Sequence, residues 1–367
     1  MRFPEFTGEW KMATFGDIAK GFDYGMNAAA KSFDGNNKYI RITDIDEVSS
    51  QYLYDDVVSP DGELEDRYLV KENDILLART GASTGKSYLY RNSDGKLYFA
   101  GFLIRANIYK HNSYFVFSQL HTLRYKKWIS VMSARSGQPG INSQEYASFP
   151  VYTTSLQEED KIATFLKLLD ERIITQNKII EKLQSLIKGL RVCCMQRVYG
   201  NNVYLSEIAQ IYQPQTISST ELTEDGFLVY GANGIIGKYK DYNHETEQIC
   251  ITCRGNTCGM VNYTKPMSWI TGNAMVINTD KYQDKVCKRY LYHYLSAYNF
   301  NSIISGSGQP QIVRTPLEKL KITLPTISEQ KQKAIIFDKI QDKIDINHKV
   351  LNLYIGQKQY LLRQMFI

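Results

Sequence analysis

Two glycine-rich turns are the segments whose residue types come nearest to phosphate chemistry. Gly81-Ala82-Ser83-Thr84-Gly85-Lys86 is similar to a nucleotide-binding loop, but it has three residues between its glycines where that motif requires four. Gly255-Asn256-Thr257-Cys258-Gly259 is followed by Met260, so it lacks a lysine for a phosphate. We expect no nucleotide site. With Arg79 or Arg254 alongside, each turn suits backbone amides near a DNA phosphate and a guanidinium at a guanine edge, and an ordinary tight turn is an equal alternative.

Metal and catalytic motifs are weaker still. Cys250, Cys253, Cys258 and Cys287 could suggest zinc, but their spacing lacks paired Cys-x-x-Cys knuckles, which favours buried small apolar side chains. The acidic segment 60–65 lacks the lysine that follows in a nuclease carboxylate cluster, and no Asn/Asp-Pro-Pro-aromatic tetrapeptide of a base-flipping methyltransferase occurs. The sequence therefore predicts no catalytic residue, no metal and no cofactor.

Charge divides sharply along the first part of the chain. Residues 1–74 hold 8 Lys or Arg against 16 Asp or Glu, whereas residues 75–144 hold 10 against the single Asp94. The second stretch also carries several tyrosines, which stack well at wet surfaces. On charge alone, a polyanion partner and a merely solvated face are equally favoured.

Length and composition bound the remaining possibilities. With 367 residues, 43% of them apolar, the chain exceeds one ordinary domain and can bury real cores, which excludes a disordered protein. No run of about 18 uncharged apolar residues exists, and six cysteines are too few for a disulfide scaffold. We therefore expect a cytoplasmic protein with no membrane partner.

An internal repeat organises the whole chain. Ser136-Gly137-Gln138-Pro139 recurs 171 residues later as Ser307-Gly308-Gln309-Pro310, and the same offset relates Gly101 to Gly272. A unit of this length is a duplicated domain rather than a short solenoid repeat. Because the Gly-Gln-Pro segment is common to both copies, a structural turn is favoured over a direct DNA contact. Residues that read bases should lie where the two copies differ.

Each copy has a mixed front and a helical back. Strand-like runs at 38–42, 74–78 and 247–251, each followed by turn residues, predict an α+β fold. Beyond each front, apolar residues alternate at spacings of four and three, which predicts two long helices that pair as a coiled coil. An internal pseudo-twofold repeat would make the pair antiparallel, with Gln176 and Asn347 as polar seam positions that set its register. The seam residues that we expect to mediate helix pairing and partner docking are Leu166, Leu169, Ile173, Gln176, Ile180, Leu183, Phe337, Ile340, Ile344, Asn347, Leu351 and Tyr354.

This order of parts resembles the specificity subunit of a type I restriction-modification system. The resemblance rests on the proline-bearing exits Phe149-Pro150 and Leu324-Pro325, the helices that follow them, and the ending Leu361–Ile367. It implies a DNA-reading protein without catalysis of its own, which binds double-stranded DNA, two methyltransferase subunits and, in the larger complex, restriction subunits. It also implies two globular α/β target recognition domains alternating with two helical spacers, at residues 1–150, 151–200, 201–325 and 326–367.

The residues expected to touch DNA come from the turns, the basic stretch and the repeated Gln. They are Arg79, Thr80, Gly81, Ser83, Thr84, Lys86, Arg105 and Gln138 in the first copy, and Arg254, Asn256, Thr257 and Gln309 in the second. Two other classes of protein stay open as alternatives. One is a DNA methyltransferase or nuclease that carries a duplicated DNA-recognition region, and the other is a coiled-coil adaptor that does not bind DNA.

Overall fold

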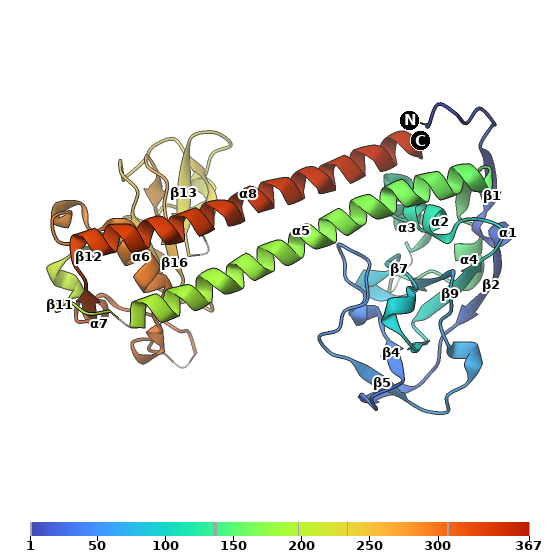
Figure 1. Ribbon diagram of the computed structural model, residues 1–367, viewed down its shortest axis with the longest axis horizontal. Helices are drawn as coiled ribbons and strands as arrows, with labels where there is room; N and C mark the ends of the chain where they lie inside the picture. Colours follow the sequence, from blue (N-terminus) through green and yellow to red (C-terminus); the bar gives the residue numbers. More distant parts are fainter. Residues whose placement is uncertain (1, 135–137, 197, 233, 307, 367) are drawn as a thin grey trace. The chain divides into compact units, whose positions relative to one another are not determined.

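The chain forms two compact units in the computed structural model (Figure 1). Unit 1 comprises Met1–Lys178 and Lys349–Ile367, and unit 2 comprises Ile179–His348. Two long helices, α5 (Leu156–Gln196) and α8 (Ile327–Met365), contribute part of their length to each unit. The described residues are 2–134, 138–196, 198–232, 234–306 and 308–366.

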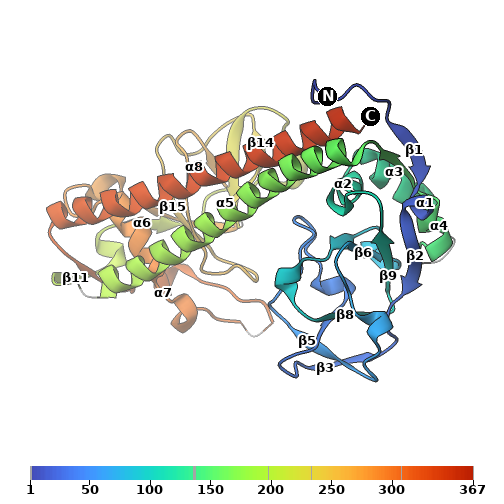
Figure 2. The ribbon, with the colours of Figure 1, turned by 45° about the vertical axis from the view of Figure 1, so that its right-hand side comes forward.

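Unit 1 is built around an antiparallel sheet with the strand order β2-β9-β6-β7. The run of four apolar residues in β6 makes this strand buried throughout. Two small sheets, β3–β5 and β4–β8, lie at the end of unit 1 away from α5 (Figure 2). Besides the long helices, unit 1 contains β1 (Lys11–Thr14), α1 (Phe15–Ile18), β2 (Ala19–Tyr24), β3 (Ala29–Ser32), β4 (Lys38–Ile40), β5 (Val58–Asp61), β6 (Asp74–Ala78), β7 (Ser87–Leu89), β8 (Leu97–Phe99), β9 (Leu103–Ile108), α2 (Ser113–Gln119), α3 (Leu123–Met132), α4 (Ser143–Ala147) and β10 (Pro150–Thr153).

Unit 2 repeats this plan. Its four-stranded antiparallel sheet has the order β12-β18-β15-β16, and the β11–β19 pair corresponds to the β1–β10 pair of unit 1. A separate three-stranded sheet, β14-β13-β17, stands where unit 1 has its two small sheets. The duplicated α+β fold predicted from the sequence is thus confirmed. The elements are β11 (Asn201–Tyr204), β12 (Gln210–Tyr212), β13 (Phe227–Gly231), β14 (Gly234–Tyr239), β15 (Ile249–Thr252), β16 (Val261–Tyr263), β17 (Trp269–Ile270), β18 (Ala274–Asn278), α6 (Lys288–Ala297), α7 (Arg314–Glu318) and β19 (Lys321–Leu324).

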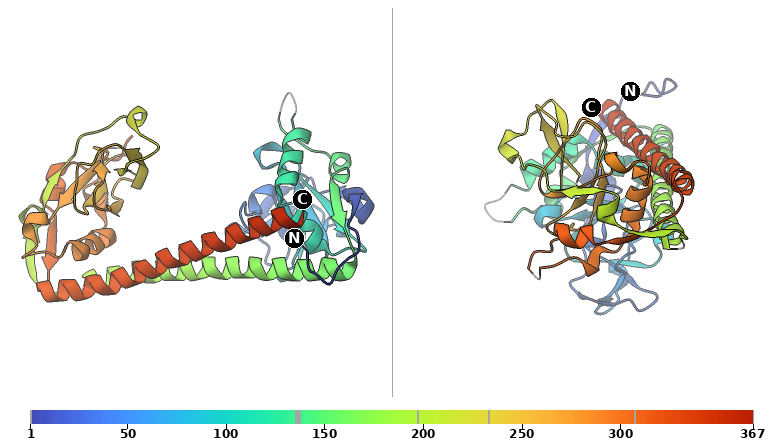
Figure 3. Two further views of the ribbon diagram at one scale, coloured as in Figure 1. Left: turned by 90° about the horizontal axis from the view of Figure 1, so that it is seen from above. Right: turned by 90° about the vertical axis from the view of Figure 1, so that its left-hand side faces the viewer.

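In unit 1, the beginning of α5 packs against the end of α8 (Figure 3). Ile162 and Leu166 share one apolar cluster with Leu362, and farther along α5 the carboxylate of Asp170 meets the ammonium of Lys358 at 2.5 Å. Residue numbers rise along one helix as they fall along the other, so the two helices are antiparallel here. Leu166 is one of the predicted seam residues, whereas Asp170 and Leu362 lie outside the predicted heptad positions.

In unit 2, the end of α5 packs against the beginning of α8 in the same antiparallel sense. Ile187 shares a cluster with Phe337 and Ile344, and the Lys333 ammonium donates to the Cys194 carbonyl at 3.4 Å. Of the predicted seam residues, seven are buried and the other five half-buried. The buried ones are Leu166, Leu169, Ile173, Gln176, Ile180, Phe337 and Ile344, and the half-buried ones are Leu183, Ile340, Asn347, Leu351 and Tyr354.

Candidate nucleic-acid interface

The glycine-rich turn of unit 1 connects β6 to β7. Gly81 and Gly85 both adopt positive φ, +74° and +91°, a backbone conformation that favours glycine. The Gly85 amide donates to the Ala78 carbonyl at 3.0 Å and closes the turn, and the Gly81 amide donates to the Pro139 carbonyl at 3.0 Å. The turn therefore contacts Pro139, which is far away in the sequence.

Unit 2 repeats these contacts almost atom for atom. Gly255 and Gly259 have φ of +84° and +90°. The Gly259 amide donates to the Thr252 carbonyl at 2.9 Å, and the Gly255 amide donates to the Pro310 carbonyl at 3.0 Å. In both units the two sequence motifs thus form one structural feature. Ser136, Gly137 and Ser307 of the repeated tetrapeptide lie outside the described residues.

This geometry supports a structural role for the turn backbone. In unit 1 the amides of Gly81, Thr84, Gly85 and Lys86 all donate to carbonyls within the protein. An amide that already donates inside the fold offers little to a DNA phosphate, so these four amides are poor candidates for the expected backbone contact, which stays a prediction for the rest of the turn. Side chains at the turn remain the candidates for DNA contact.

The two candidate arginines occupy neighbouring rather than equivalent positions. The Ile141 amide donates to the Arg79 carbonyl at 2.9 Å, whereas the matching Ile312 amide donates to the Cys253 carbonyl at 3.0 Å. Arg254 therefore corresponds to Thr80 rather than to Arg79. Because side chains alternate along extended backbone, a shift by one residue changes the direction in which the guanidinium points.

Their surroundings also differ. The Arg79 guanidinium lies over the Tyr24 ring, 4.8 Å from its centroid, and donates to the Gly101 carbonyl at 3.3 Å. Arg254 is exposed, and no ion pair involves it in the part of the chain that the structure describes. Arg254 is therefore the more accessible of the two.

Two of the basic side chains predicted to bind DNA already pair with acidic side chains of the protein. The Arg105 guanidinium donates to Asp23 at 2.7 Å and to the Leu69 carbonyl at 3.1 Å, which favours a structural role. The Lys86 ammonium pairs with Glu47 at 2.9 Å. Other predicted residues remain open to solvent at least in part; these are Thr80, Gly81, Ser83, Thr84, Asn256 and Thr257 at the turns, and the exposed Gln138 and Gln309.

A helix that was not among the predicted site residues also borders the turn of unit 1. The Tyr125 hydroxyl on α3 donates to the Gly85 carbonyl at 3.0 Å, and Ile129 packs directly on Gly85. On α3, Lys126 and Lys127 are both exposed. The basic composition of residues 75–144 was the sequence signal for this surface, although it did not single out the helix.

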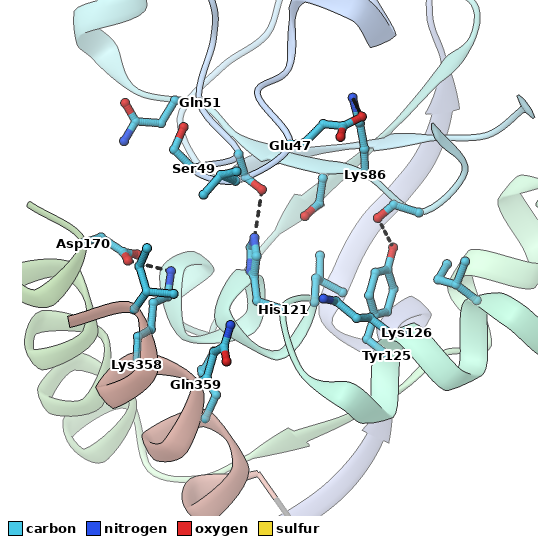
Figure 4. Close-up of a pocket in the computed structure, with 18 of the residues that line it drawn as sticks. Glu47, Ser49, Gln51, Lys86, His121, Tyr125, Lys126, Asp170, Lys358 and Gln359 are labelled. Atoms are coloured by element: carbon cyan, nitrogen blue, oxygen red, sulfur yellow. Dashed lines mark hydrogen bonds and ion pairs between the residues drawn. The ribbon is translucent and has the colours of Figure 1, made fainter. Parts of the chain in front are cut away.

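A cavity of about 540 Å³ lies in unit 1 between the loop Glu47–Gln51, α3 and both long helices (Figure 4). His121 lines it, with Nδ1 3.0 Å from the Phe117 carbonyl and Nε2 3.0 Å from the Ser50 hydroxyl. A carbonyl only accepts, so Nδ1 carries the hydrogen and Nε2 accepts from Ser50. Burial, with a contribution from the Lys358 charge, lowers the pKa of His121 to about 4 and keeps the ring neutral.

A partly buried polar cluster in unit 2 joins three helices. His293 on α6 is fully buried, and its Nε2 lies 2.8 Å from Asp338 Oδ1 on α8. Arg191 on α5 donates to His293 Nδ1 at 2.9 Å, and Arg289 on α6 donates to the Asp338 carboxylate. Burial lowers the pKa of His293, whereas the bonds from His293 and Arg289 outweigh burial and lower the pKa of Asp338.

The cysteines of unit 2 show no sign of ligand chemistry. Cys250 is fully buried in β15, where burial raises the pKa of its thiol to about 12. Cys253 is also buried and packs in the main apolar cluster of the unit. Across the described residues, no group of three or more His, Cys, Asp or Glu side chains is placed to hold a metal ion. None of the described helices is long and apolar enough to cross a membrane.

Comparison with known families defines the class of this duplicated fold. A family model described as the type I restriction modification DNA specificity domain matches residues 7–185 and again residues 201–353. The chain therefore belongs to this family, as its sequence predicted.

Individual relatives agree with this assignment. The chain is 31% identical over 147 residues to the type I restriction enzyme EcoprrI specificity subunit of Escherichia coli, across 39% of this chain and 36% of that one. It is 23% identical over 410 residues to the MjaVIII specificity subunit of Methanocaldococcus jannaschii, across 95% of this chain and 89% of that one. The crystal structure of a type I restriction-modification S subunit from M. genitalium has the same fold, with a TM-score of 0.68 at 16% identity over 98% of this chain and 96% of that one.

Proposed function

We propose that this chain is a non-catalytic specificity subunit that recognises a bipartite DNA sequence, with one half-site read by each unit. In this proposal it docks two methyltransferase subunits and, in the larger complex, restriction subunits. The observation that carries the proposal is the duplication itself, because the family model matches the chain twice and each unit has a glycine-rich turn that donates to the carbonyl of a distant proline. Two similar readers with different exposed side chains suit two different short sequences.

The long helices offer a surface for the methyltransferase subunits. Besides its buried seam, α8 exposes Ile346, Leu353 and Tyr360 at intervals of seven residues, with exposed fractions of 57%, 72% and 56%. On α5, Leu168 and Leu186 are likewise about half exposed. Apolar side chains that repeat along one helix face outside its seam are typical of a surface that a partner helix covers.

Co-expression with a type I methyltransferase subunit tests the proposal. Methylation should appear at one sequence with two specified parts and an unspecified gap, and only when both proteins are present. Sequencing that detects modified bases across the host genome gives the result directly. Methylation by this chain alone would instead indicate a fused enzyme, and a complex that assembles but methylates without sequence preference would contradict a specificity role.

The same assay tests the interface through its two arginines. Arg254→Ala should weaken recognition of one half-site by about 1–3 kcal/mol if the guanidinium contacts a base. Arg79→Ala should have the smaller effect on the other half-site, because its guanidinium is already held by Tyr24 and the Gly101 carbonyl. Unchanged base preferences in both variants would remove these positions from the DNA interface.

A further inference from the structure

Unit 2 has a polar contact that joins its recognition fold to both long helices at one point. His293 and Arg289 lie on α6, which packs in the main apolar cluster of the unit together with strands of its sheet. Asp338 belongs to α8 and Arg191 to α5. The four side chains therefore connect three helices that are far apart in the sequence.

The direction of each hydrogen bond in this cluster is fixed by which of its groups can donate and which can accept. Arginine cannot accept, so His293 Nδ1 must accept from Arg191, with Nε at 3.2 Å and Nη2 at 2.9 Å. Nε2 then carries the ring hydrogen and donates to Asp338 Oδ1 at 2.8 Å. Arg289 Nε donates to the same oxygen at 2.8 Å, so the position of each group depends on the others.

Aromatic rings fix the two guanidinium groups from the sides. Arg289 lies 4.3 Å from the ring centroid of Tyr263 in β16 and 5.3 Å from that of Tyr292, and Arg191 lies 5.6 Å from that of Tyr292. Because His293 is fully buried, water cannot replace a lost partner without a rearrangement of the helices. Apolar contacts alone would permit small slides of α6 along α5 and α8, whereas this cluster permits one arrangement.

We propose that His293, Asp338 and Arg191 are positioning residues that fix the orientation of the second recognition fold on the helix pair, and thereby the gap length that the protein accepts. This inference rests on the proposed function. One base pair extends about 3.4 Å along the helix axis, so a slide or tilt of a few ångströms at the fold shifts its half-site by about one base pair. These residues would determine spacing without touching any base.

The test uses the chain assembled with its methyltransferase partner and a library of duplexes. Each duplex carries the two half-sites recognised by the wild-type protein, separated by the native gap or by one or two base pairs more or fewer. Asp338→Asn keeps the shape of the side chain but removes its charge, and Arg191→Met removes the donor to His293 while keeping an apolar stem. Glu318→Gln in the exposed Arg314–Glu318 pair of the same unit is the matched control.

We expect both cluster variants to recognise the same half-site sequences as the wild type. The ratio of methylation at gaps that differ by one base pair to methylation at the native gap should rise about tenfold relative to the wild type, which corresponds to about 1.4 kcal/mol. The control should keep the wild-type ratio. A uniform fall in methylation at every gap, with the ratio unchanged, would show that the cluster only stabilises the fold and would overturn the proposal. If Asp338→Asn prevents assembly, the milder Arg191→Met variant decides between these outcomes. Failure of the wild-type complex to prefer any gap would instead count against the proposed function.

Discussion

The two units attach their recognition folds to the same pair of helices with different chemistry. In unit 1, Asp170 on α5 accepts from the Tyr114 hydroxyl on α2 and pairs with Lys358 on α8. In unit 2 the carboxylate is on α8, and its partners are a guanidinium and an imidazole from α6. Both solutions place one carboxylate where three helices meet. Duplication has therefore preserved the architecture of the attachment and not the residues that make it.

A half-buried histidine in unit 1 and a buried histidine in unit 2 show the same contrast at atomic scale. His121 in unit 1 carries its hydrogen on Nδ1, because the Phe117 carbonyl accepts from that atom. His293 in unit 2 carries its hydrogen on Nε2, because Arg191 donates to Nδ1. Burial lowers the pKa of both rings. Each unit thus contains a neutral histidine whose protonation would disrupt its local contacts.

Removal of the carboxylate from each attachment should give the largest difference in stability between the two units. Asp338→Ala leaves Arg289 and Arg191 near a partly buried site without a counter-charge, and we expect unit 2 to lose about 3 kcal/mol of its free energy of unfolding. Asp170→Ala leaves one ammonium and one hydroxyl, and about 1–2 kcal/mol should be lost from unit 1. Hydrogen exchange in peptides from α6 and α2 measures each unit separately. Equal losses in the two units would mean that the difference in chemistry has no energetic consequence.

Acidification should destabilise unit 1 through His121. Its pKa of about 4 in the folded protein lies below the ordinary value near 6.5 of the unfolded chain, so between these values the unfolded chain binds the proton and the folded chain does not. The stabilisation is complete above about pH 6.5 and falls as the pH drops toward 4, by up to about 3 kcal/mol. His121→Gln should flatten this dependence in peptides from α2 and α3, as measured by hydrogen exchange at pH 7, 5.5 and 4.5. An identical pH dependence in the variant would assign the effect to other groups.

The sequence predicted the parts of this molecule better than their contacts. The long helices follow from local heptad spacing, and the strand-like runs at 38–42, 74–78 and 247–251 correspond to β4, β6 and β15. The duplication could be recognised from the sequence because its offset of 171 residues is constant through the later part of each copy. Each of these signals depends on residue order alone.

Contacts between segments that are far apart in the sequence could not be predicted from residue order. Arg105 was predicted to face DNA from its charge, yet Asp23, 82 residues away, binds its guanidinium. The Gly81–Pro139 contact and the His293–Asp338 pair likewise join segments whose proximity only the folded chain creates. Composition identified the basic stretch, but burial and pairing decide which of its charges remain available.

The two units differ in the positively charged side chains that remain exposed beside the glycine-rich turn. In unit 1, Ile129 of α3 packs on Gly85, and in unit 2 Phe300, 171 residues later, packs on Gly259. The exposed Lys126 and Lys127 precede Ile129, whereas Ala297 and Tyr298 stand at the matching positions before Phe300. The acids that line the nearby cavity, Glu47 and Asp170, already pair with Lys86 and Lys358. Unit 1 therefore presents two ammonium groups beside its turn that unit 2 lacks.

The smallest expected effect is in the salt dependence of DNA binding. Each lysine that neutralises a phosphate releases counterions and contributes about −0.9 to the slope of log K against log salt concentration. Lys126→Gln with Lys127→Gln should make the slope for the assembled complex on its duplex less negative by about 2, with base preferences unchanged, because phosphate contacts do not read sequence. Lys240→Gln with Lys265→Gln removes the same charge from exposed positions of unit 2 and should change the slope less. Equal changes in both double variants would indicate a general effect of net charge. If the slope of the Lys126 and Lys127 double variant equals that of the wild type, these lysines do not contact DNA phosphates, and α3 becomes a candidate surface for an acidic protein. The charge difference between the two units would then play no part in DNA binding.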